Sequence, residues 1–502
     1  MAKKILSYWF LPVLALVLLL RLPSLFEPFT YGDEGIYLTL GQGLRKGLVF
    51  YRDIHDNKPP MLYLLAAVAG NFETYRLILF GWSLGTIYLF FKLAERLFPK
   101  KPLAVIASTT AFALLTSLHN FEGNVANAEN FMMLPTIAAF YLALPDLEKI
   151  GLKKKTLQDL RAWLLAGVFL SIATLFKVPA AFDFLALLSL LFLSLTLKNF
   201  FLVIRNGLMA LLGFLIPVGL SLAYYAWQGA WSEYLKAAFL QNIPYLSSWA
   251  AGRAQVGGLP LFLLGRGLLV FLLVLGLFFL RKKVSLSIKL TLAWFAFSWF
   301  AALLSARPYP HYLIQILPAL SLAVGFFWLH PIKIKFWWEK AIPLVLGFVV
   351  LVTFSGFHFW YYKNLPYYRN FYGHLLGLKS RDDYYLAFDP RTETIYQAAN
   401  YLKTHTLPQE KIFIWGNDPF LYALAQRLPI GRYTVAYHII DFNGYQETMK
   451  ALNQNPPRYL IISGTEDRLF PELKTLISNH YLFETRIGNL QFFHRNAKIR
   501  RQ

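Results

Sequence analysis

Long apolar runs dominate this chain and decide what it can fold into. The sequence has 502 residues, of which 57% are hydrophobic and 17% are aromatic. Runs of about 18 to 22 apolar residues recur along it, the length that an α-helix needs to cross a bilayer. We therefore expect a polytopic α-helical membrane protein with about eleven transmembrane helices. The expected spans are 5–22, 76–98, 102–118, 128–145, 162–178, 180–197, 207–227, 259–280, 286–305, 311–330 and 341–360.

The basic residues indicate how these spans are oriented. The formal net charge is +22, but Lys and Arg fall largely in short clusters between apolar runs. This is the positive-inside pattern rather than a basic binding face, so a nucleic-acid partner is excluded. The N-terminus is then inside and the C-terminus outside the cytoplasmic membrane. The clusters expected on the cytoplasmic side are Lys3/Lys4, Lys100/Lys101, Lys153/Lys154/Lys155, Lys198/Arg205, Arg281/Lys282/Lys283 and Lys333/Lys335/Lys340.

The start of the chain and its cysteine content add two constraints. An apolar run follows Lys3 and Lys4 with no small-residue cleavage motif after it, which favours a retained first helix over a signal peptide. The sequence has no cysteine, so it offers no disulfide, thiolate nucleophile or cysteine-based metal site.

The first outer loop, residues 23–75, is expected to carry two interfacial amphipathic helices, 34–48 and 60–72. The apolar segment 61–70 is too short to span, and counting it as a crossing would move Lys100/Lys101 to the outer face. Pro59 and Pro60 suit the start of the second helix, because first-turn N–H groups have no helical partner.

Beyond residue 360 the pattern changes to ordinary polar spacing. Strand-like runs occur at 411–415, 458–463 and 490–494, and helical patterns occur near 394–404 and 419–427. We predict a transmembrane domain over 1–360 and a small external α/β domain over 361–502.

Ionisable residues at the membrane edge are the candidate site. Asp33 and Glu34 follow the first span, and Asp56 and Lys58 precede the two prolines. The topology puts these residues on the outer side with His119, Glu122, Glu129, Arg307 and His311, and we expect them to converge. A carboxylate there can take a proton from an acceptor, and Lys or Arg can hold a phosphate.

Each candidate also has a plainer interpretation. Loop carboxylates are often only solvated and paired with neighbours. Lys58 can be an interfacial snorkelling lysine, and the segment from Arg307 to Tyr312 can be an aromatic-belt anchor. Lys177, in a tight outer turn, is a further phosphate-facing candidate. The histidines are too scattered for zinc catalysis, while a divalent ion bridging Asp33, Glu34 and a phosphate stays open.

These motifs, in this order, resemble the GT-C membrane glycosyltransferases, in particular the protein mannosyltransferase and lipid A aminoarabinose transferase group. The resemblance is carried by Asp33-Glu34 and Asn57-Lys58-Pro59-Pro60, and is supported by Asn127-Ala128-Glu129-Asn130 and Pro310-His311-Tyr312. It is strongest over residues 25–100 and weak over the C-terminal domain. The oligosaccharyltransferase motif Trp-Trp-Asp-Tyr-Gly is absent, which argues against en bloc transfer to Asn.

The resemblance implies an inverting transfer of a sugar from a polyprenyl-phosphate donor to a lipid, glycan or protein acceptor on the outer face. It implies Asp33 as the catalytic base or acceptor-orienting carboxylate, Glu34 as its partner, and Lys58 as a contact to the carrier phosphate. To these we add Arg307, His311 and Tyr312 on the donor side, with Asp56 and Glu129 as acceptor-side or accessory residues.

Two other functions remain open at this point. One is a carrier or flippase for lipid-linked saccharides, which would need ionisable residues within the spans; Asp183 is the main example. The other is a polymerase or ligase of surface polysaccharide.

Overall fold

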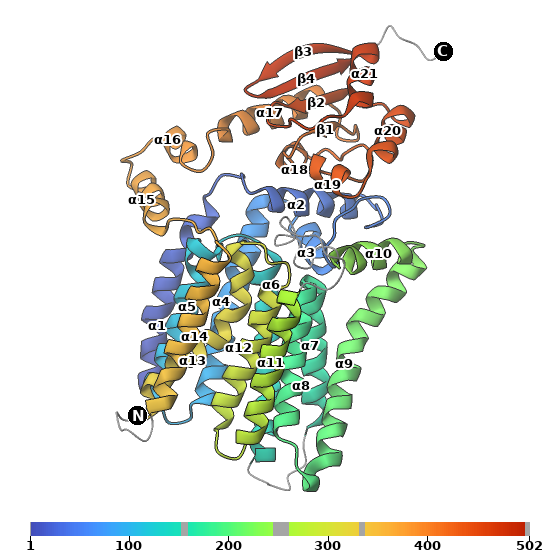
Figure 1. Ribbon diagram of the computed structural model, residues 1–502. Coiled ribbons are helices and arrows are strands. Elements are labelled where there is room, and N and C mark those ends of the chain that lie inside the picture. Colours follow the sequence, from blue (N-terminus) through green and yellow to red (C-terminus); the bar gives the residue numbers. More distant parts are fainter. Residues whose placement is uncertain (1, 152–158, 244–260, 331–336, 497–502) are drawn as a thin grey trace. The chain divides into compact units, whose positions relative to one another are not determined.

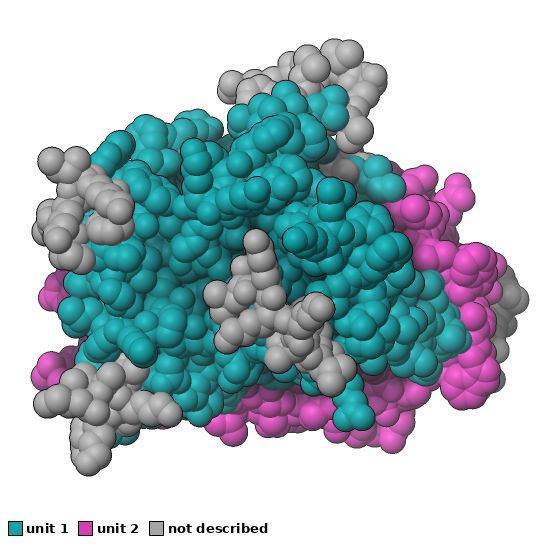
Figure 2. Space-filling model, turned by 90° about the horizontal axis from the view of Figure 1, so that it is seen from below, with its two compact units in different colours: residues 1–22, 79–224, 241–364 teal, residues 23–78, 225–240, 365–502 magenta. Residues whose placement is uncertain are grey.

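The computed structural model describes residues 2–151, 159–243, 261–330 and 337–496 (Figure 1). The predicted basic residues Lys153, Lys154, Lys155, Lys333 and Lys335 lie outside these ranges, as do residues 259 and 260 at the start of one predicted span. The chain forms two compact units (Figure 2). Unit 1 comprises residues 1–22, 79–224 and 241–364, and unit 2 comprises residues 23–78, 225–240 and 365–502.

Unit 1 is a bundle of helices that run side by side in the described part of the chain (Figure 1). Proline or a side-chain cap marks several helix starts, such as Asp159, whose carboxylate accepts from Arg161 N–H at 3.0 Å. The helices are α1 (Ala2–Arg21), α4 (Phe72–Leu97, from residue 79), α5 (Pro102–Ser117), η2 (His119–Phe121), α6 (Ala128–Gly151), α7 (Leu160–Phe176), η3 (Val178–Ala180), α8 (Ala181–Leu193), η4 (Leu197–Asn199), α9 (Phe200–Trp227, to residue 224), η5 (Leu240–Asn242), α11 (Leu261–Leu280), α12 (Leu286–Ala302), η7 (Pro310–Ile316), α13 (Leu317–Val324), η8 (Gly325–Trp328) and α14 (Trp337–Gly356).

All eleven predicted spans fall on helices, but their lengths differ. Among the described residues, six helical stretches are long and apolar enough to cross a membrane, and five further apolar stretches have 17 residues or fewer. The six are Phe72–Leu97, Ala128–Ile150, Leu197–Trp227, Leu263–Leu280, Pro310–Trp328 and Trp337–Gly356. Eleven crossings, and the side of the membrane on which each loop lies, therefore stay predictions.

Burial differs sharply among these six stretches. In α9, α11 and α14 only 22% of the most apolar 18-residue stretch is buried, whereas the buried share is 72% in α6 and in Pro310–Trp328. Exposed apolar faces are what lipid-facing helices require. The stretches α6 and η7–η8 therefore form the interior of unit 1, and they carry its polar cluster described below.

Unit 2 joins the first loop of the sequence to its C-terminal third. The loop forms η1 (Leu22–Leu25, from residue 23), α2 (Gly32–Arg45) and α3 (Met61–Ala69), and residues 225–240 add α10 (Trp231–Ala238). The two interfacial segments predicted at 34–48 and 60–72 are thus helices, and α3 is as short as expected. The loop groups with residues 365–502 in unit 2, and the domain boundary at residue 360 stays a prediction.

The C-terminal part of unit 2 contains a four-stranded mixed sheet in the order β1-β2-β4-β3. Strands β1 (Phe413–Trp415) and β2 (Tyr459–Ser463) are parallel, with Ile414 opposite Ile461. Strands β4 (Leu490–Arg495) and β3 (Tyr481–Ile487) continue the sheet antiparallel. The helices are α15 (Asn364–Leu375), α16 (Arg381–Leu386), α17 (Thr392–His405), α18 (Phe420–Ala425), α19 (Ala436–Asp441), α20 (Tyr445–Gln454) and α21 (Pro471–His480).

The predicted α/β character of this region is confirmed, with one strand missed. Strands were expected at 411–415, 458–463 and 490–494, and β1, β2 and β4 lie there. The missed strand β3 is at the edge of the sheet, and several of its side chains are exposed, so no apolar alternation marks it in the sequence.

Close helix contacts fix α2 within unit 2. A Cβ on Gly35 would lie 2.7 Å from the backbone nitrogen of Phe420 in α18, and a Cβ on Gly41 would lie 2.7 Å from backbone atoms of Ala66 and Ala67 in α3. Glycine is therefore required at both positions for α2 to pack between the two other helices. Gln42 adds a hydrogen bond from its amide to the carbonyl of Ala423 at 2.9 Å.

Candidate functional site

The first turn of α2 presents Asp33. The helix has no side-chain cap, and Asp33 and Glu34 occupy its first turn. Negative charge is favourable there because the unpaired N–H groups give a helix N-terminus a partial positive charge. The Asp33 side chain is 34% exposed. It is therefore held by the protein yet remains accessible.

Asp33, Tyr37 and Lys58 form one contact group. The Tyr37 hydroxyl donates to Asp33 Oδ2 at 2.8 Å, and Lys58 Nζ lies 3.6 Å from the same oxygen. Lys58 Nζ also lies 5.0 Å from the centre of the Tyr37 ring, within cation–π range. Burial, followed by the Asp33 charge, raises the pKa of Tyr37 well above its ordinary value, so its hydroxyl remains a donor. A half-exposed carboxylate and ammonium are thus positioned side by side.

The loop that carries Lys58 is anchored by a strained tyrosine. Tyr51 has φ +73°, a conformation that is costly for a bulky residue. Its N–H donates to Ile54 O at 2.7 Å and its hydroxyl donates to Lys58 O at 2.9 Å. Its ring packs on Tyr225 and Tyr234, with ring centres 5.0 and 5.1 Å away. These contacts stabilise the strained conformation of Tyr51 and fix the backbone at Lys58.

Asp56 is buried behind this loop, with 1% of the residue exposed. Its Oδ1 accepts from Asn57 N–H at 2.6 Å and lies 3.8 Å from Nε2 of His438 in α19. Burial alone would raise the pKa of Asp56, but the charges of Lys58 and His438 and the hydroxyl of the buried Tyr63 hold it below its ordinary value. Asp56 is therefore a buried carboxylate that fixes the backbone directly before Lys58.

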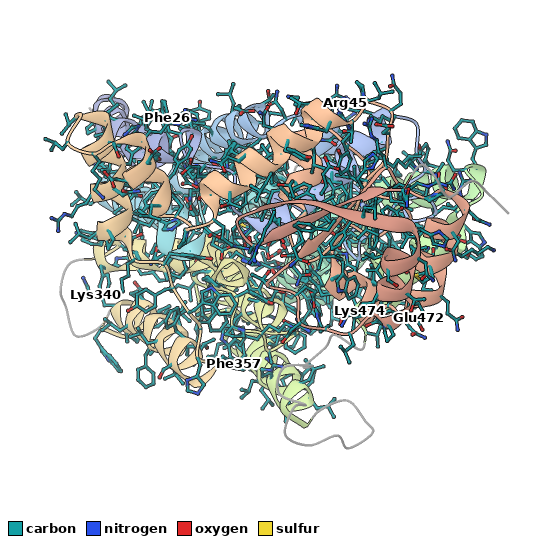
Figure 3. All side chains as sticks on the ribbon, turned by 90° about the horizontal axis from the view of Figure 1, so that it is seen from above. Phe26, Arg45, Lys340, Phe357, Glu472 and Lys474 are labelled. Atoms are coloured by element: carbon teal, nitrogen blue, oxygen red, sulfur yellow. The ribbon has the colours of Figure 1, made fainter. Side chains whose placement is uncertain are left out.

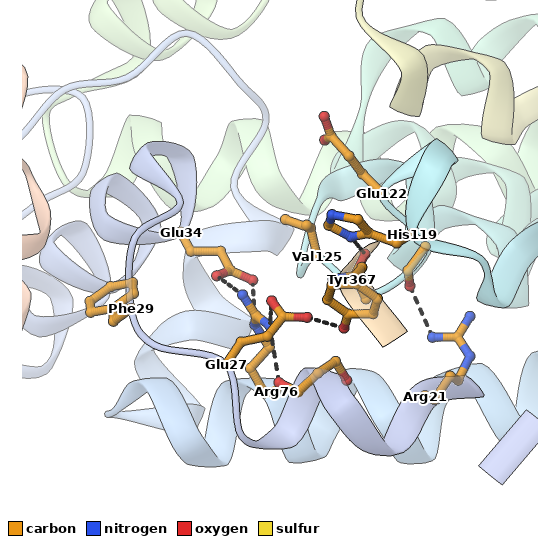
Figure 4. A network of polar contacts seen from close by, with 12 residues as sticks. Arg21, Glu27, Phe29, Glu34, Arg76, His119, Glu122, Val125 and Tyr367 are labelled. Carbon is orange, nitrogen blue, oxygen red and sulfur yellow. Dashed lines mark hydrogen bonds and ion pairs between the residues drawn. The ribbon is translucent and has the colours of Figure 1, made fainter. Parts of the chain in front are cut away.

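Glu34 has a different environment from its neighbour Asp33, and Figure 4 shows the contacts of Glu34 with Arg76. Its two oxygens accept from Arg76 Nε and Nη2 at 2.8 and 2.7 Å, and no part of its side chain is exposed. Arg76 Nη1 also binds Glu27 Oε2 at 2.7 Å, and Tyr367 donates to Glu27 Oε1. The expected partnership of Glu34 with Asp33 is thus replaced by a buried ion network that ties α2 to the start of α4 and to α15.

Unit 1 holds a second charged cluster, within its interior. His311 Nδ1 lies 2.7 Å from Glu122 Oε2 and its Nε2 lies 3.7 Å from Glu129 Oε1. Glu129 also pairs with Lys177, whose ammonium lies 3.7 Å from the centre of the Tyr312 ring. Two carboxylates, one ammonium and one imidazole thus form a continuous chain that links η2, α6, η3 and η7.

The segment before α6 is fixed by two features of unit 1. Glu122 has φ +57°, and its side chain accepts from Asn127 at 2.9 Å. Arg21, at the end of α1, donates to Ser117 Oγ and to the carbonyls of Thr116 and Gly123 at 3.1, 2.6 and 2.9 Å. A buried arginine that binds backbone carbonyls holds this segment rigidly.

The predicted site residues thus fall into two groups of four. Unit 2 contains Asp33, Glu34, Asp56 and Lys58, of which Asp33, Asp56 and Lys58 act on one another. Unit 1 contains Glu129, Arg307, His311 and Tyr312. His311, Glu129 and Tyr312 belong to the cluster above, whereas Arg307 lies half-buried before η7, with its N–H donating to Ser305 Oγ at 3.3 Å.

Several site residues were missed from the sequence. Tyr37 stands four residues after Asp33, a spacing that puts both on one helix face, so a signal was present. Arg76 is a lone cation at the start of an apolar helix, which also marks it as unusual. His438 gives no such signal, because it lies more than 370 residues from Asp56 in the sequence and only the fold brings the two together.

The residues do not fit the divalent ion considered between Asp33 and Glu34. Both Glu34 oxygens are already bound by Arg76, and Lys58 stands beside Asp33. Among the residues that the structure describes, no group of three or more His, Asp or Glu side chains is arranged to hold a metal ion.

An open pocket of about 470 Å³ lies in the C-terminal part of unit 2. It is lined by the β1 residue Trp415, by Glu466 and Arg468, and by Lys474 of α21, and none of the predicted site residues is among its lining. Glu472 and Lys474 are labelled on α21 in Figure 3, and both are exposed.

Comparison with known proteins identifies the fold. No protein-family model matches the chain, and no curated protein matches it. Two crystal structures of ArnT from Cupriavidus metallidurans are similar over 98% of this chain and 98% of theirs. The structure bound to undecaprenyl phosphate has a TM-score of 0.59 at 14% identity, and the apo structure has 0.55 at 15%. The GT-C resemblance is thereby confirmed at the level of the fold.

Proposed function

We propose that this chain is an inverting membrane glycosyltransferase that transfers a sugar from a polyprenyl-phosphate donor to an acceptor hydroxyl or amine. The observation that carries the proposal is the half-exposed pair of Asp33 and Lys58 at the N-terminus of α2. A carboxylate that can accept a proton thus lies beside an ammonium that can bind phosphate, in a chain whose fold is similar to that of ArnT. The undecaprenyl phosphate bound by that ArnT supports a polyprenyl-phosphate donor.

The geometry supports a single displacement step. Asp33 takes the proton from the acceptor, and the acceptor atom attacks the anomeric carbon on the face opposite the phosphate. The bond between that carbon and the phosphate oxygen breaks, and polyprenyl phosphate leaves with its electron pair. Lys58 stabilises the charge that grows on the leaving phosphate. Because the new bond forms opposite the old one, the anomeric configuration is inverted.

The remaining predicted residues take supporting roles in this proposal. Arg307, His311 and Tyr312 serve the donor side, and Glu129 orients Lys177 and His311 by charge. Asp56 is accessory, because it is buried and acts on Lys58 rather than on a ligand. Glu34 is structural, since Arg76 occupies its carboxylate. We place the reaction on the outer face of the cytoplasmic membrane, with the N-terminus inside and the C-terminal domain outside.

The test is transfer of radiolabelled sugar from a panel of polyprenyl-phosphate monosaccharides into membrane extracts by purified protein. Asp33→Asn is expected to lower turnover by about 10²- to 10⁴-fold, the usual contribution of a general base. Lys58→Ala is expected to lower kcat/KM by about 10- to 100-fold, through loss of a charged hydrogen bond to phosphate. The anomeric configuration of the product tests inversion.

Two matched variants control for charge removal alone. Glu73→Gln removes an exposed carboxylate from the first turn of α4, and Lys46→Ala removes an exposed lysine of unit 2. Both should transfer sugar at the wild-type rate. Near-normal turnover by Asp33→Asn would disprove its role as the base. If no donor on the panel is consumed while labelled lipid-linked sugar crosses proteoliposomes, the protein is a carrier. A product of many sugar units would instead identify a polymerase.

A further inference from the structure

The C-terminal part of unit 2 binds directly to the loop that carries Lys58. His55 N–H donates to Arg432 O at 2.9 Å, and Arg432 Nη1 donates to Tyr51 O at 3.3 Å. The His55 ring packs edge-on against Tyr433 and Phe442, with ring centres 5.5 and 4.7 Å apart. Residues 432–442 therefore contact the loop at Tyr51 and His55, which are close in sequence to Lys58.

His438 belongs to this contacting segment, and its side chain faces Asp56. It is 5% exposed, and its Nε2 lies 3.8 Å from Asp56 Oδ1. Its Nδ1 is buried without a hydrogen-bond partner in the described structure. Burying such polar atoms is costly, and an apolar pair of the same size would pack at this place without that cost. The polar pair therefore points to a function beyond packing.

The backbone contact of Asp56 connects the pair to Lys58. Asp56 Oδ1 accepts from the N–H of Asn57 at 2.6 Å, and Asn57 directly precedes Lys58. The ammonium of Lys58 in turn lies 3.6 Å from Asp33 Oδ2 and 5.0 Å from the centre of the Tyr37 ring.

We propose that His438 is a positioning residue that acts through Asp56 to hold Lys58 in the orientation needed to bind the donor phosphate. The inference rests on the proposed glycosyl transfer and extends it to the C-terminal domain. That domain then contributes to donor binding through one buried contact, in addition to bracing the loop.

The experiment measures donor KM and kcat for full-length protein with the polyprenyl-phosphate sugar that the wild type consumes. His438→Leu removes both ring nitrogens, whereas His438→Gln keeps a polar group that can face Asp56. His405→Leu, an exposed histidine of the same domain, is the matched control. Both His438 variants are also combined with Lys58→Ala, and undecaprenyl phosphate binding is measured in parallel for every variant.

His438→Leu should raise donor KM by about tenfold and change kcat by less than about threefold, because a displaced Lys58 weakens phosphate binding. His438→Gln should restore KM to within about threefold, and His405→Leu should match the wild type. In the Lys58→Ala background the His438→Leu effect should fall below about twofold, since residues that act through one another are not additive.

An effect of His438→Leu that persists in full without Lys58, or that falls on kcat alone, would overturn the inference while leaving the transferase intact. If the wild type consumes no donor and binds no undecaprenyl phosphate, the proposed function itself fails and the inference fails with it. Should His438→Leu not fold, Asp56→Asn takes its place in the same cycle. Asp56→Asn must then raise the donor KM on its own, and it must not raise the donor KM further when it is combined with Lys58→Ala.

Discussion

The buried Arg76 network gives the sharpest test of which carboxylate on α2 does the chemistry. Glu34 and Glu27 flank one guanidinium, so the network contains two negative charges and one positive charge. Glu34→Gln removes one charge and turns one oxygen into a donor that faces Arg76. The variant should therefore lose stability rather than catalytic power.

The geometry sets the size of the effect. Glu34 receives two charged hydrogen bonds of 2.8 and 2.7 Å, each worth about 1.5–3 kcal/mol in a buried site. We expect Glu34→Gln to lower the free energy of unfolding by about 1.5–3 kcal/mol, because one charged hydrogen bond is lost while Glu27 still pairs with Arg76. Arg76→Met should cost more, because it leaves two carboxylates buried without a cation.

The assay compares stability and activity in the same preparations. In thermal unfolding in detergent, the melting temperature should be highest for the wild type, lower for Glu34→Gln and lowest for Arg76→Met. The folded fraction of Glu34→Gln, measured below its melting temperature, should transfer sugar within about tenfold of the wild type, whereas Asp33→Asn should melt normally and transfer almost nothing. A Glu34→Gln protein with wild-type stability and no activity would refute the structural assignment and restore Glu34 to the catalytic pair.

Two further predictions concern His55 and Gly41 of unit 2, the second with Gly81 of unit 1 as its control. Burial, followed by the charges of His438 and Arg432, lowers the pKa of His55 to about 3 from an ordinary 6.5. The contribution of neutral His55 to the free energy of unfolding is thus fully present above pH 6.5. It falls by up to about 1.4 kcal/mol per pH unit toward pH 3, because the unfolded chain binds a proton that the folded protein excludes. Melting curves of His55→Phe should lack this part of the decrease in stability. Gly41→Ala should lower stability by about 1–3 kcal/mol because its Cβ meets Ala66. Gly81→Ala, in open space on α4, should raise it by up to about 1 kcal/mol, and an unchanged melting temperature for Gly41→Ala would contradict the packing.

Much of the architecture could be predicted because its signals are local. Apolar runs of membrane length locate the helices of unit 1, and a run of only ten apolar residues identifies α3 as too short to span. The strands β1, β2 and β4 have enough apolar content to be found. The edge strand β3 was missed because its exposed side chains leave no apolar alternation to detect.

The site was harder to predict because its contacts join distant segments. Asp33 and Lys58 could be found, since ionisable residues beside an apolar span are unusual. His438, the partner of Asp56, could not be found from the sequence, because it belongs to α19 and no local pattern connects the two positions. The predicted topology did bring Glu122 and His311 of unit 1 together, although they lie 189 residues apart, and the two meet at 2.7 Å.

The two adjacent carboxylates of α2 show why residue type alone does not assign a role. Successive residues of an α-helix point about 100° apart, so Asp33 and Glu34 cannot face the same neighbours. Asp33 shares its face with Tyr37 and Lys58 and is accessible, whereas Glu34 points inward to Arg76. The close approach of Gly35 and Gly41 to other helices fixes the rotation of α2 about its axis. Because packing fixes that rotation, we expect Asp33 to stay accessible in Glu34→Gln, which should lower stability and leave the face of Asp33 in place.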